Sequence, residues 1–576
     1  MPNHGLFRRR WDRAFLASAV LAAGALGLLL SAGCSLFREP ADLLLINGTV
    51  STLDEAKPRA EAVAIRGDRI VFVGSSGEAA DYRGAETELM DLAGKTVVPG
   101  FADSHAHLSG IGAREMDLNL EGVAGLGELL EKVSERAGRS EPGEWIVGRG
   151  WIEARWDPPA FPTRWDLDRI APQNPVWLVR ADGHGGVANS LALRVIGIRK
   201  GVKDPPGGEI LREAKTGEPT GMLIDRAQSI IARFLPKDTP ERKRQALLLG
   251  VRRSLEMGWT QVGIAGNSYD EVEMLRSLYE AGEIPLRLYN AVRGPGPDAD
   301  RLLKEGPTIG SYGGLYTLRG IKAMADGALG SRGAALFEKY EDHDGPGLLM
   351  FERDEVLPML ERALRAGIQV QTHAIGDRAN RFVLDVYEEA FRYVPPGERK
   401  IPEPRWRIEH AQILDVADIP RFAALRVIPS MQPSHAITDL YFAKRRLGEK
   451  RLAGAYAWRS LLDAGARIAG GSDAPVEKGD PVVEFYAAVA RKDLRGQSEG
   501  HWHLEQRVSR EEALKMLTQW PAYATFEERS RGSIAAGKWA DLTVLSQDIM
   551  TVEESRIPQT RCEMTIVAGK VAYRRR

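Results

Sequence analysis

Histidines and an aspartate stand where short apolar stretches of this sequence end. His105 and His107 close the run Val-Pro-Gly-Phe-Ala-Asp-Ser-His-Ala-His, and on a strand residues two apart point to the same side. Further stretches end at His373, His410 and Asp473. The chain has ten histidines, so four at such positions are not expected by chance. Imidazole and carboxylate are the ligands that zinc and similar divalent ions prefer, and these residues therefore predict a metal site.

Lys322 ends another apolar stretch. A lysine buried among apolar neighbours loses its charge readily and becomes nucleophilic. If it captures carbon dioxide, the carbamate has two oxygens that can bridge two metals. An ion pair with Asp326 and a single cation over the site are the alternatives.

A divalent metal lowers the pKa of bound water and supplies hydroxide at neutral pH, and a second metal can polarise a carbonyl. Asp473 would take a proton from the water and pass it to the leaving group, as a general acid and base. The expected chemistry is hydrolysis by metal-activated hydroxide.

Eight strand candidates position these residues. Amphipathic helices alternate with them, for example over 241–257, 269–281, 354–366 and 379–393, a pattern typical of parallel βαβ units. The fold class is therefore α/β, and a TIM-like (β/α)8 barrel is the simplest arrangement, with catalytic groups at the carboxyl ends of the strands. The strands are expected at 97–103, 259–265, 285–293, 317–324, 367–373, 405–410, 425–431 and 466–472.

Two segments near the ends of the chain do not show this alternation of strands and helices. Residues 41–98 and 530–576 contain short strands with tight turns, and we expect them to form one small β-sandwich domain. The barrel then spans 99–529. Residues 108–240 do not fit a single helix, contain strand-like pieces at 144–150 and 175–180, and are predicted to be a large insertion after the first barrel strand, over the active-site face.

Five other residues are candidates for substrate binding. His184 in the insertion can donate a hydrogen bond to a substrate oxygen or be a structural imidazole. Arg149 and Trp151 can form a cationic, aromatic wall or belong to the core of the insertion. Asp326 can contact the substrate or the metal ligands, and His435 follows the seventh strand.

Composition excludes several classes of protein. The chain of 576 residues carries 78 Lys and Arg against 79 Asp and Glu, and this balance gives no basic surface for nucleic acid. Two cysteines, Cys34 and Cys562, cannot form a disulfide framework or a cysteine metal site. A homo-oligomer is compatible with the sequence, and so is a monomer.

The first 34 residues are typical of an export signal. Four arginines precede an apolar run over 14–32, and Leu30 to Cys34 resembles a bacterial lipoprotein cleavage box. We expect Cys34 to become the lipidated N-terminus, which would hold the protein on the cell envelope, facing the periplasm or the outside of the cytoplasmic membrane. An uncleaved anchor helix, a soluble secreted product and, if the apparent signal is a wrongly assigned start, a cytoplasmic protein are the alternatives.

The motifs together resemble the amidohydrolase superfamily, in particular the branch that contains N-substituted formamide deformylases. The resemblance covers residues 41–576 and implies two divalent metals. By this resemblance His105, His107 and Asp473 bind one metal, His373 and His410 bind the other, and carboxylated Lys322 bridges them. It rests on VVPGFADSHAHL, DGHGGVANS, GEPTGMLIDRA, IKAMADGALGSRGAAL, QTHAIGDRAN, RIEHAQ, PSMQPSHA, GGSDAPV and RGSIAAGKWADLTVL.

The sequence thus predicts a metal-dependent enzyme that hydrolyses a non-peptide carbon–nitrogen bond in a small molecule, such as an N-substituted amide or formamide. Zinc is the expected metal, although iron, manganese and cobalt accept the same ligands. One alternative is an ester or lactone hydrolase of the same fold, because the same hydroxide attacks any activated carbonyl. The other is a surface lipoprotein that binds a ligand without turning it over.

Overall fold

The computed structural model describes residues 38–235, 239–498 and 502–576. The predicted signal segment and Cys34 lie outside these residues. Within the described part, no helix combines the length and the apolar character needed to cross a membrane.

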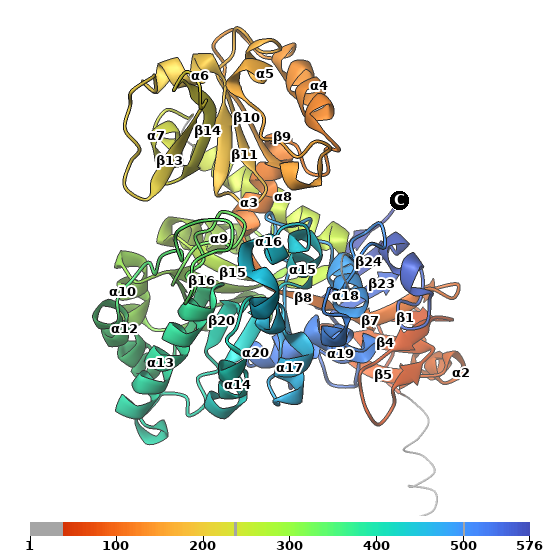
Figure 1. Ribbon diagram of the computed structural model, residues 1–576. Helices are drawn as coiled ribbons and strands as arrows, with labels where there is room; N and C mark the ends of the chain where they lie inside the picture. The colour runs from red at the N-terminus through yellow and green to blue at the C-terminus, as the bar shows by residue number, and fades with distance from the viewer. Residues whose placement is uncertain (1–37, 236–238, 499–501) are drawn as a thin grey trace, which may run out of the picture.

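A parallel barrel of eight strands forms the centre of the molecule (Figure 1). The sheet closes where the Asp473 N–H donates to the carbonyl of His105 at 2.7 Å and the His107 N–H donates to that of Ala474 at 2.8 Å. The predicted α/β barrel is therefore confirmed. In sheet order its strands are β8 (Phe101–Ala106), β15 (Trp259–Asn267), β16 (Arg287–Arg293), β18 (Tyr316–Met324), β19 (Gln369–Ala374), β20 (Arg407–His410), β21 (Ile428–Met431) and β22 (Ala469–Gly470).

The first predicted strand, 97–103, is divided in the structure. β7 (Thr96–Pro99) belongs to the small terminal domain, and β8 starts the barrel after Gly100. A Cβ at Gly100 would lie 2.3 Å from Oγ1 of Thr260, so the chain can cross between the two sheets only with a glycine at this position. The prediction of one continuous strand is wrong for this reason.

Helices surround the barrel on the outside and bury one apolar face against it. The first long helix against the barrel is α8 (Pro240–Met257). It begins with a proline after the N-cap Thr239, whose hydroxyl accepts a hydrogen bond from the Arg242 N–H. It ends at the C-cap Gly258, which has the left-handed backbone conformation with φ 104°. The next helices follow the expected alternation with the strands. They include α9 (Tyr269–Glu280), α10 (Pro297–Glu305), α12 (Arg353–Ala366), α13 (Asp377–Tyr393), α14 (Ile419–Leu425), α17 (Trp458–Asp463), α18 (Pro481–Ala490) and α19 (Arg510–Met516).

The segment between β8 and α8 forms a separate layer. After α3 (Leu108–Met116) the chain enters a mixed sheet of six strands with its own apolar clusters, and it returns to the barrel through α8, which packs beside α3. Figure 1 shows this layer on one side of the barrel. Its strands are β9 (Leu118–Asn119), β10 (Ile146–Trp151), β11 (Val176–Arg180), β12 (Gly185–Ala188), β13 (Gly208–Arg212) and β14 (Pro219–Asp225), with helices α4 (Leu126–Ala137), α5 (Arg164–Asp168), α6 (Ser190–Val195) and α7 (Gln228–Ala232).

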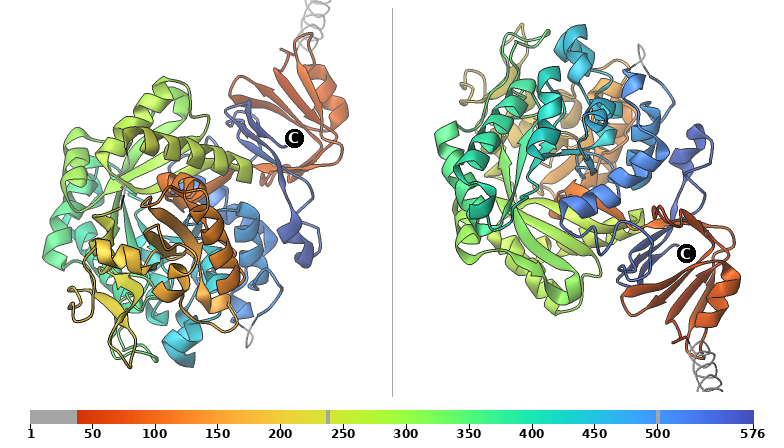
Figure 2. Two further views of the ribbon diagram at one scale, coloured as in Figure 1. Left: turned by 90° about the horizontal axis from the view of Figure 1, so that it is seen from above. Right: turned by 90° about the horizontal axis from the view of Figure 1, so that it is seen from below.

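Both chain ends meet in a pair of sheets beside the barrel (Figure 2). A buried ion pair ties this domain to the barrel, because Nε of Arg287 donates to Asp541 at 2.6 Å and Nη2 donates at 3.1 Å. One sheet contains β1 (Leu43–Ile46), β4 (Ala62–Arg66), β5 (Arg69–Gly74) and β6 (Glu88–Asp91), and the other contains β2 (Thr49–Ser51), β3 (Arg59–Ala60), β7, β23 (Leu542–Leu545), β24 (Cys562–Val567) and β25 (Lys570–Arg574).

Candidate metal centre

Three buried side chains converge at the carboxyl ends of the barrel strands. His105 at the end of β8, His410 at the end of β20 and Asp473 after β22 each offer one ligand atom, and these atoms lie within 4.8 Å of one another. Nε2 of His105 is 3.4 Å from Oδ1 of Asp473. Both atoms are buried and have no hydrogen-bond partner among the described residues.

Hydrogen bonds on the far side of each imidazole fix its tautomer. Nδ1 of His105 lies 2.5 Å from the carboxylate of Glu409, and Nδ1 of His410 lies 2.8 Å from Oε1 of Gln432. Both oxygens are acceptors, so each Nδ1 carries the proton and each Nε2 keeps its lone pair. Two lone pairs and a carboxylate therefore face one another, and a bound cation satisfies all three.

The protein environment favours this protonation state. Burial lowers the pKa of His105 to about 4, helped by Lys322 and opposed by Glu409 and Asp473. Burial, together with His373, lowers the pKa of His410 well below its usual value. Burial raises the pKa of Asp473, but the neighbouring His105 and His107 more than offset this and bring it well below the usual range. The residues present thus fit a divalent metal.

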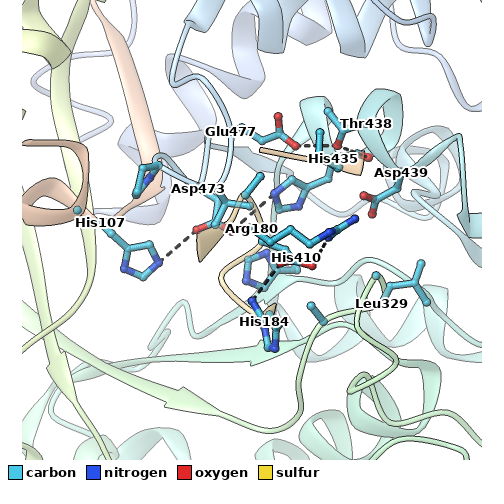
Figure 3. Close-up of a pocket in the computed structure, with 18 of the residues that line it drawn as sticks. His107, Arg180, His184, Leu329, His410, His435, Thr438, Asp439, Asp473 and Glu477 are labelled. Atoms are coloured by element: carbon cyan, nitrogen blue, oxygen red, sulfur yellow. Dashed lines mark hydrogen bonds and ion pairs between the residues drawn. The ribbon is translucent and has the colours of Figure 1, made fainter. Parts of the chain in front are cut away.

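The remaining predicted ligands surround this group of three. Nε2 of His107 lies 3.2 Å from Oδ1 of Asp473, and its side chain is partly exposed to the cavity (Figure 3). The ring of His373 lies 4.5 Å from that of His410, centre to centre. Lys322 lines the same cavity, and burial lowers the pKa of its amine. The group of three takes His105 and Asp473 from one predicted metal site and His410 from the other.

A buried ion pair orients His105, and the sequence analysis did not identify it. The guanidinium of Arg407 donates to Glu409 at 2.7 Å and 3.0 Å and also contacts the Ser104 carbonyl. Burial raises the pKa of Glu409, but Arg407 and His105 outweigh it and lower the pKa far below its usual value. The spacing of Arg407 and Glu409 could have indicated this pair, because residues two apart on a strand point to the same face and charges on a buried face need partners.

Replacing Glu409 by Gln should weaken metal binding about 10- to 100-fold, because a neutral amide oxygen is a weaker acceptor for the Nδ1–H of His105 than a carboxylate and leaves its imidazole a poorer ligand. Competition with a metal chelator measures this affinity. Glu484→Gln is the matched control, because Glu484 is also a buried carboxylate but bonds the Ser434 N–H at 2.8 Å. Unchanged affinity in Glu409→Gln would contradict the orienting role.

A cavity of about 480 Å³ opens above the converging ligands. The barrel and the insertion both line it, and Figure 3 shows His184 and His435 among its side chains. Nδ1 of His184 lies 2.9 Å from Asp225, and Nε2 of His435 lies 3.6 Å from Oδ2 of Asp473. Arg149 also lines the cavity. The structure therefore places three of the five predicted substrate-binding residues at the cavity.

Trp151 and Asp326 lie elsewhere. Trp151 is fully buried in the core of the insertion, where its indole N–H donates to the Leu178 carbonyl at 3.1 Å. The pairing of β10 shifts register between Arg149 and Trp151, at Gly150 with φ 114°, so these two residues do not share a face as they would on a regular strand. Asp326 is fully buried, accepts from the N–H groups of Ile375 and Gly376, and lies 3.3 Å from Nε2 of His373. Neither side chain lines the cavity, so Trp151 follows the alternative of a core residue and Asp326 that of a contact to a predicted metal ligand.

Comparisons with known proteins agree with this geometry. The family model described as "Amidohydrolase family" matches residues 88–573. The chain is 35% identical over 547 residues to Protein LONG AFTER FAR-RED 3 of Arabidopsis thaliana, covering 92% of each chain. It is 32% identical over 550 residues to the N-substituted formamide deformylase of Arthrobacter pascens, covering 93% of this chain and 98% of the relative.

Among solved structures, an uncharacterized metal-dependent hydrolase from Pyrococcus furiosus has a TM-score of 0.68 and 28% identity, over 88% of this chain and 100% of the other. A fold and a site of this kind define a metal-dependent hydrolase that acts on carbon–nitrogen bonds other than peptide bonds, as predicted. The chain belongs to the amidohydrolase family.

Proposed function

We propose that this protein hydrolyses N-substituted amides or formamides with two divalent metal ions, preferably zinc. The observation that carries the proposal is the set of three buried ligand atoms, from His105, His410 and Asp473, that lie within 4.8 Å of one another. The similarity to a relative named N-substituted formamide deformylase supports this choice of substrate.

The ligands would divide between two adjoining sites. His105, His107 and Asp473 would hold one ion and His373 and His410 the other, with Lys322 between them as a carbamate formed with carbon dioxide. The lowered pKa of Lys322 supports this role, because a neutral amine is the form that reacts with carbon dioxide. When bound, such ions lower the pKa of water and polarise a carbonyl.

The side chains of the protein supply the other steps. Asp473 is an anion at neutral pH and can accept a proton at Oδ1, then deliver it to the leaving amine. Nε2 of His435 is buried, has no hydrogen-bond partner in the described chain and lines the cavity, so it is placed to bond a substrate oxygen. Residues of the insertion, among them Arg149 and His184, form part of the cavity wall.

A substrate screen tests the proposal. The metal-loaded protein is incubated with matched N-formyl and N-acetyl amines and with the corresponding esters and lactones, and the released amine or alcohol is measured. We expect the amides to be hydrolysed with the higher kcat/KM. Preferred ester or lactone cleavage would favour the alternative hydrolase, and tight binding without turnover would favour a binding protein.

We also propose that Cys34 carries a lipid that holds the protein on the cell envelope. The support is the arginine-rich start, the apolar run and the Leu30 to Cys34 box. Labelling of expressing bacteria with a fatty-acid analogue should mark the wild-type protein, processed at Cys34, and leave the Cys34→Ser variant unmarked. An unlabelled protein in the soluble fraction of lysed cells would contradict the proposal.

A further inference from the structure

Arg149 is held at the cavity in a fixed orientation. It extends from β10, and its Nη2 donates to the carbonyl of Ala181 at 3.1 Å. The turn beyond Ala181 packs closely on it, since a Cβ at Gly183, where φ is +74°, would lie 3.3 Å from Nη2. Nε of Arg149 is buried and has no hydrogen-bond partner among the described residues.

Two other cations of the cavity pair directly with carboxylates. Arg180 pairs with Glu153 at 2.8 Å and with Asp182, and Lys478 pairs with Asp480 at 3.1 Å. For Arg149, no carboxylate oxygen lies within 4.0 Å in the parts of the chain that the structure describes.

Burial makes this uncompensated charge costly. It lowers the pKa of Arg149, although Asp182 and Asp473 act in the opposite direction. A buried guanidinium is normally paired, and an anion that entered the cavity would gain a charge-assisted, two-pronged contact. Because Arg149 and Asp473 line the same cavity, this anion would be bound in the cavity that also holds the reacting bond.

We propose that Arg149 binds a carboxylate of the substrate and that the preferred substrates are N-formyl or N-acyl amino acids. This inference rests on the proposed function. A formyl group has no position for a second charge, so the carboxylate belongs to the amine portion, one carbon from the nitrogen of the bond that breaks. Arg149 is thus a specificity-determining residue, and the insertion that carries it selects the substrate.

A matched pair of substrates tests the inference. N-formylphenylalanine and N-formyl-2-phenylethylamine differ only in the carboxylate, and each is assayed with the metal-loaded full chain. We expect kcat/KM to favour the acid by about tenfold or more, mainly through KM. Arg149→Met should remove this preference, with the larger loss of kcat/KM for the acid. Arg149→Lys should keep part of the preference, because lysine retains the charge without the planar fork of donors.

Lys478→Met is the control, because Lys478 lines the same cavity but is already paired with Asp480, and it should keep the full preference. Equal kcat/KM for the two compounds in the wild type, or equal losses for both in Arg149→Met, would overturn the inference. Calorimetric binding of each compound provides a second readout. If neither compound is hydrolysed, tighter binding of the acid than of the neutral amide, seen in the wild type but not in Arg149→Met, still supports the role of Arg149. Equal binding of the two compounds by the wild type overturns this role. Failure of every amide in the wider screen counts against the proposed function.

Discussion

Replacing Asp473 by Asn is expected to lower kcat for amide hydrolysis about 10²- to 10⁴-fold, the usual loss when a general acid and base is removed. The amide has the shape of the carboxylate but cannot take up a proton at Oδ1. It also removes the negative charge that faces the lone pairs of His105 and His410. Rates are measured by release of the amine at matched metal content per chain, so that the loss of the proton acceptor is separated from a loss of bound metal.

A suitable control for this variant is Asp439→Asn. Asp439 also lines the cavity, but it accepts from Gln412 at 2.7 Å and from Tyr456 at 2.6 Å. We expect this change to alter kcat far less than the change at Asp473. Wild-type activity in Asp473→Asn with a full metal complement would rule out Asp473 as the group that moves the proton.

Replacing Lys322 by Ala should have the second large effect. If its carbamate bridges two ions, the variant loses the shared ligand, and both metal content and kcat should fall, with kcat reduced by about 100-fold or more. Metal analysis of the purified protein and the amide assay measure these quantities together. Burial of Lys322 at the end of β18, facing the same cavity as His105 and His410, is the structural reason for this expectation.

Lys478→Ala serves as the control for this loss, since Lys478 is an exposed lysine of the same cavity that pairs with Asp480. It should leave the metal content unchanged. If Lys322→Ala kept both its metal and its full activity, Lys322 would be a neighbour of the centre and not a ligand.

The sequence predicted the barrel and its reacting groups because both depend on local patterns. His105 and His107 alternate on one strand, and His373 and His410 end apolar stretches, so the parallel topology alone brings them to one end of the barrel. The ends of α8 could also be predicted, because Thr239 and Gly258 are typical cap residues.

Contacts between distant segments could not be predicted in this way. Glu409 meets His105 across 304 residues of sequence, and nothing near either residue indicates which buried strand will lie beside it. Trp151 illustrates the same limit, because the bulge in β10 between Arg149 and Trp151 turns the indole to the core of the insertion, although Arg149 lines the cavity. The change of sheet at Gly100 depends on the position of Thr260, which packs against it from β15.

Anomalous X-ray scattering at the zinc absorption edge, from crystals of the zinc-loaded protein, tests the metal centre most directly. The account predicts two peaks at the mouth of the barrel, each about 2.0–2.2 Å from its nitrogen or oxygen ligands. These ligands should come from His105, His107, Lys322, His373, His410 and Asp473. An absence of peaks among these side chains in a fully active crystal preparation would contradict it.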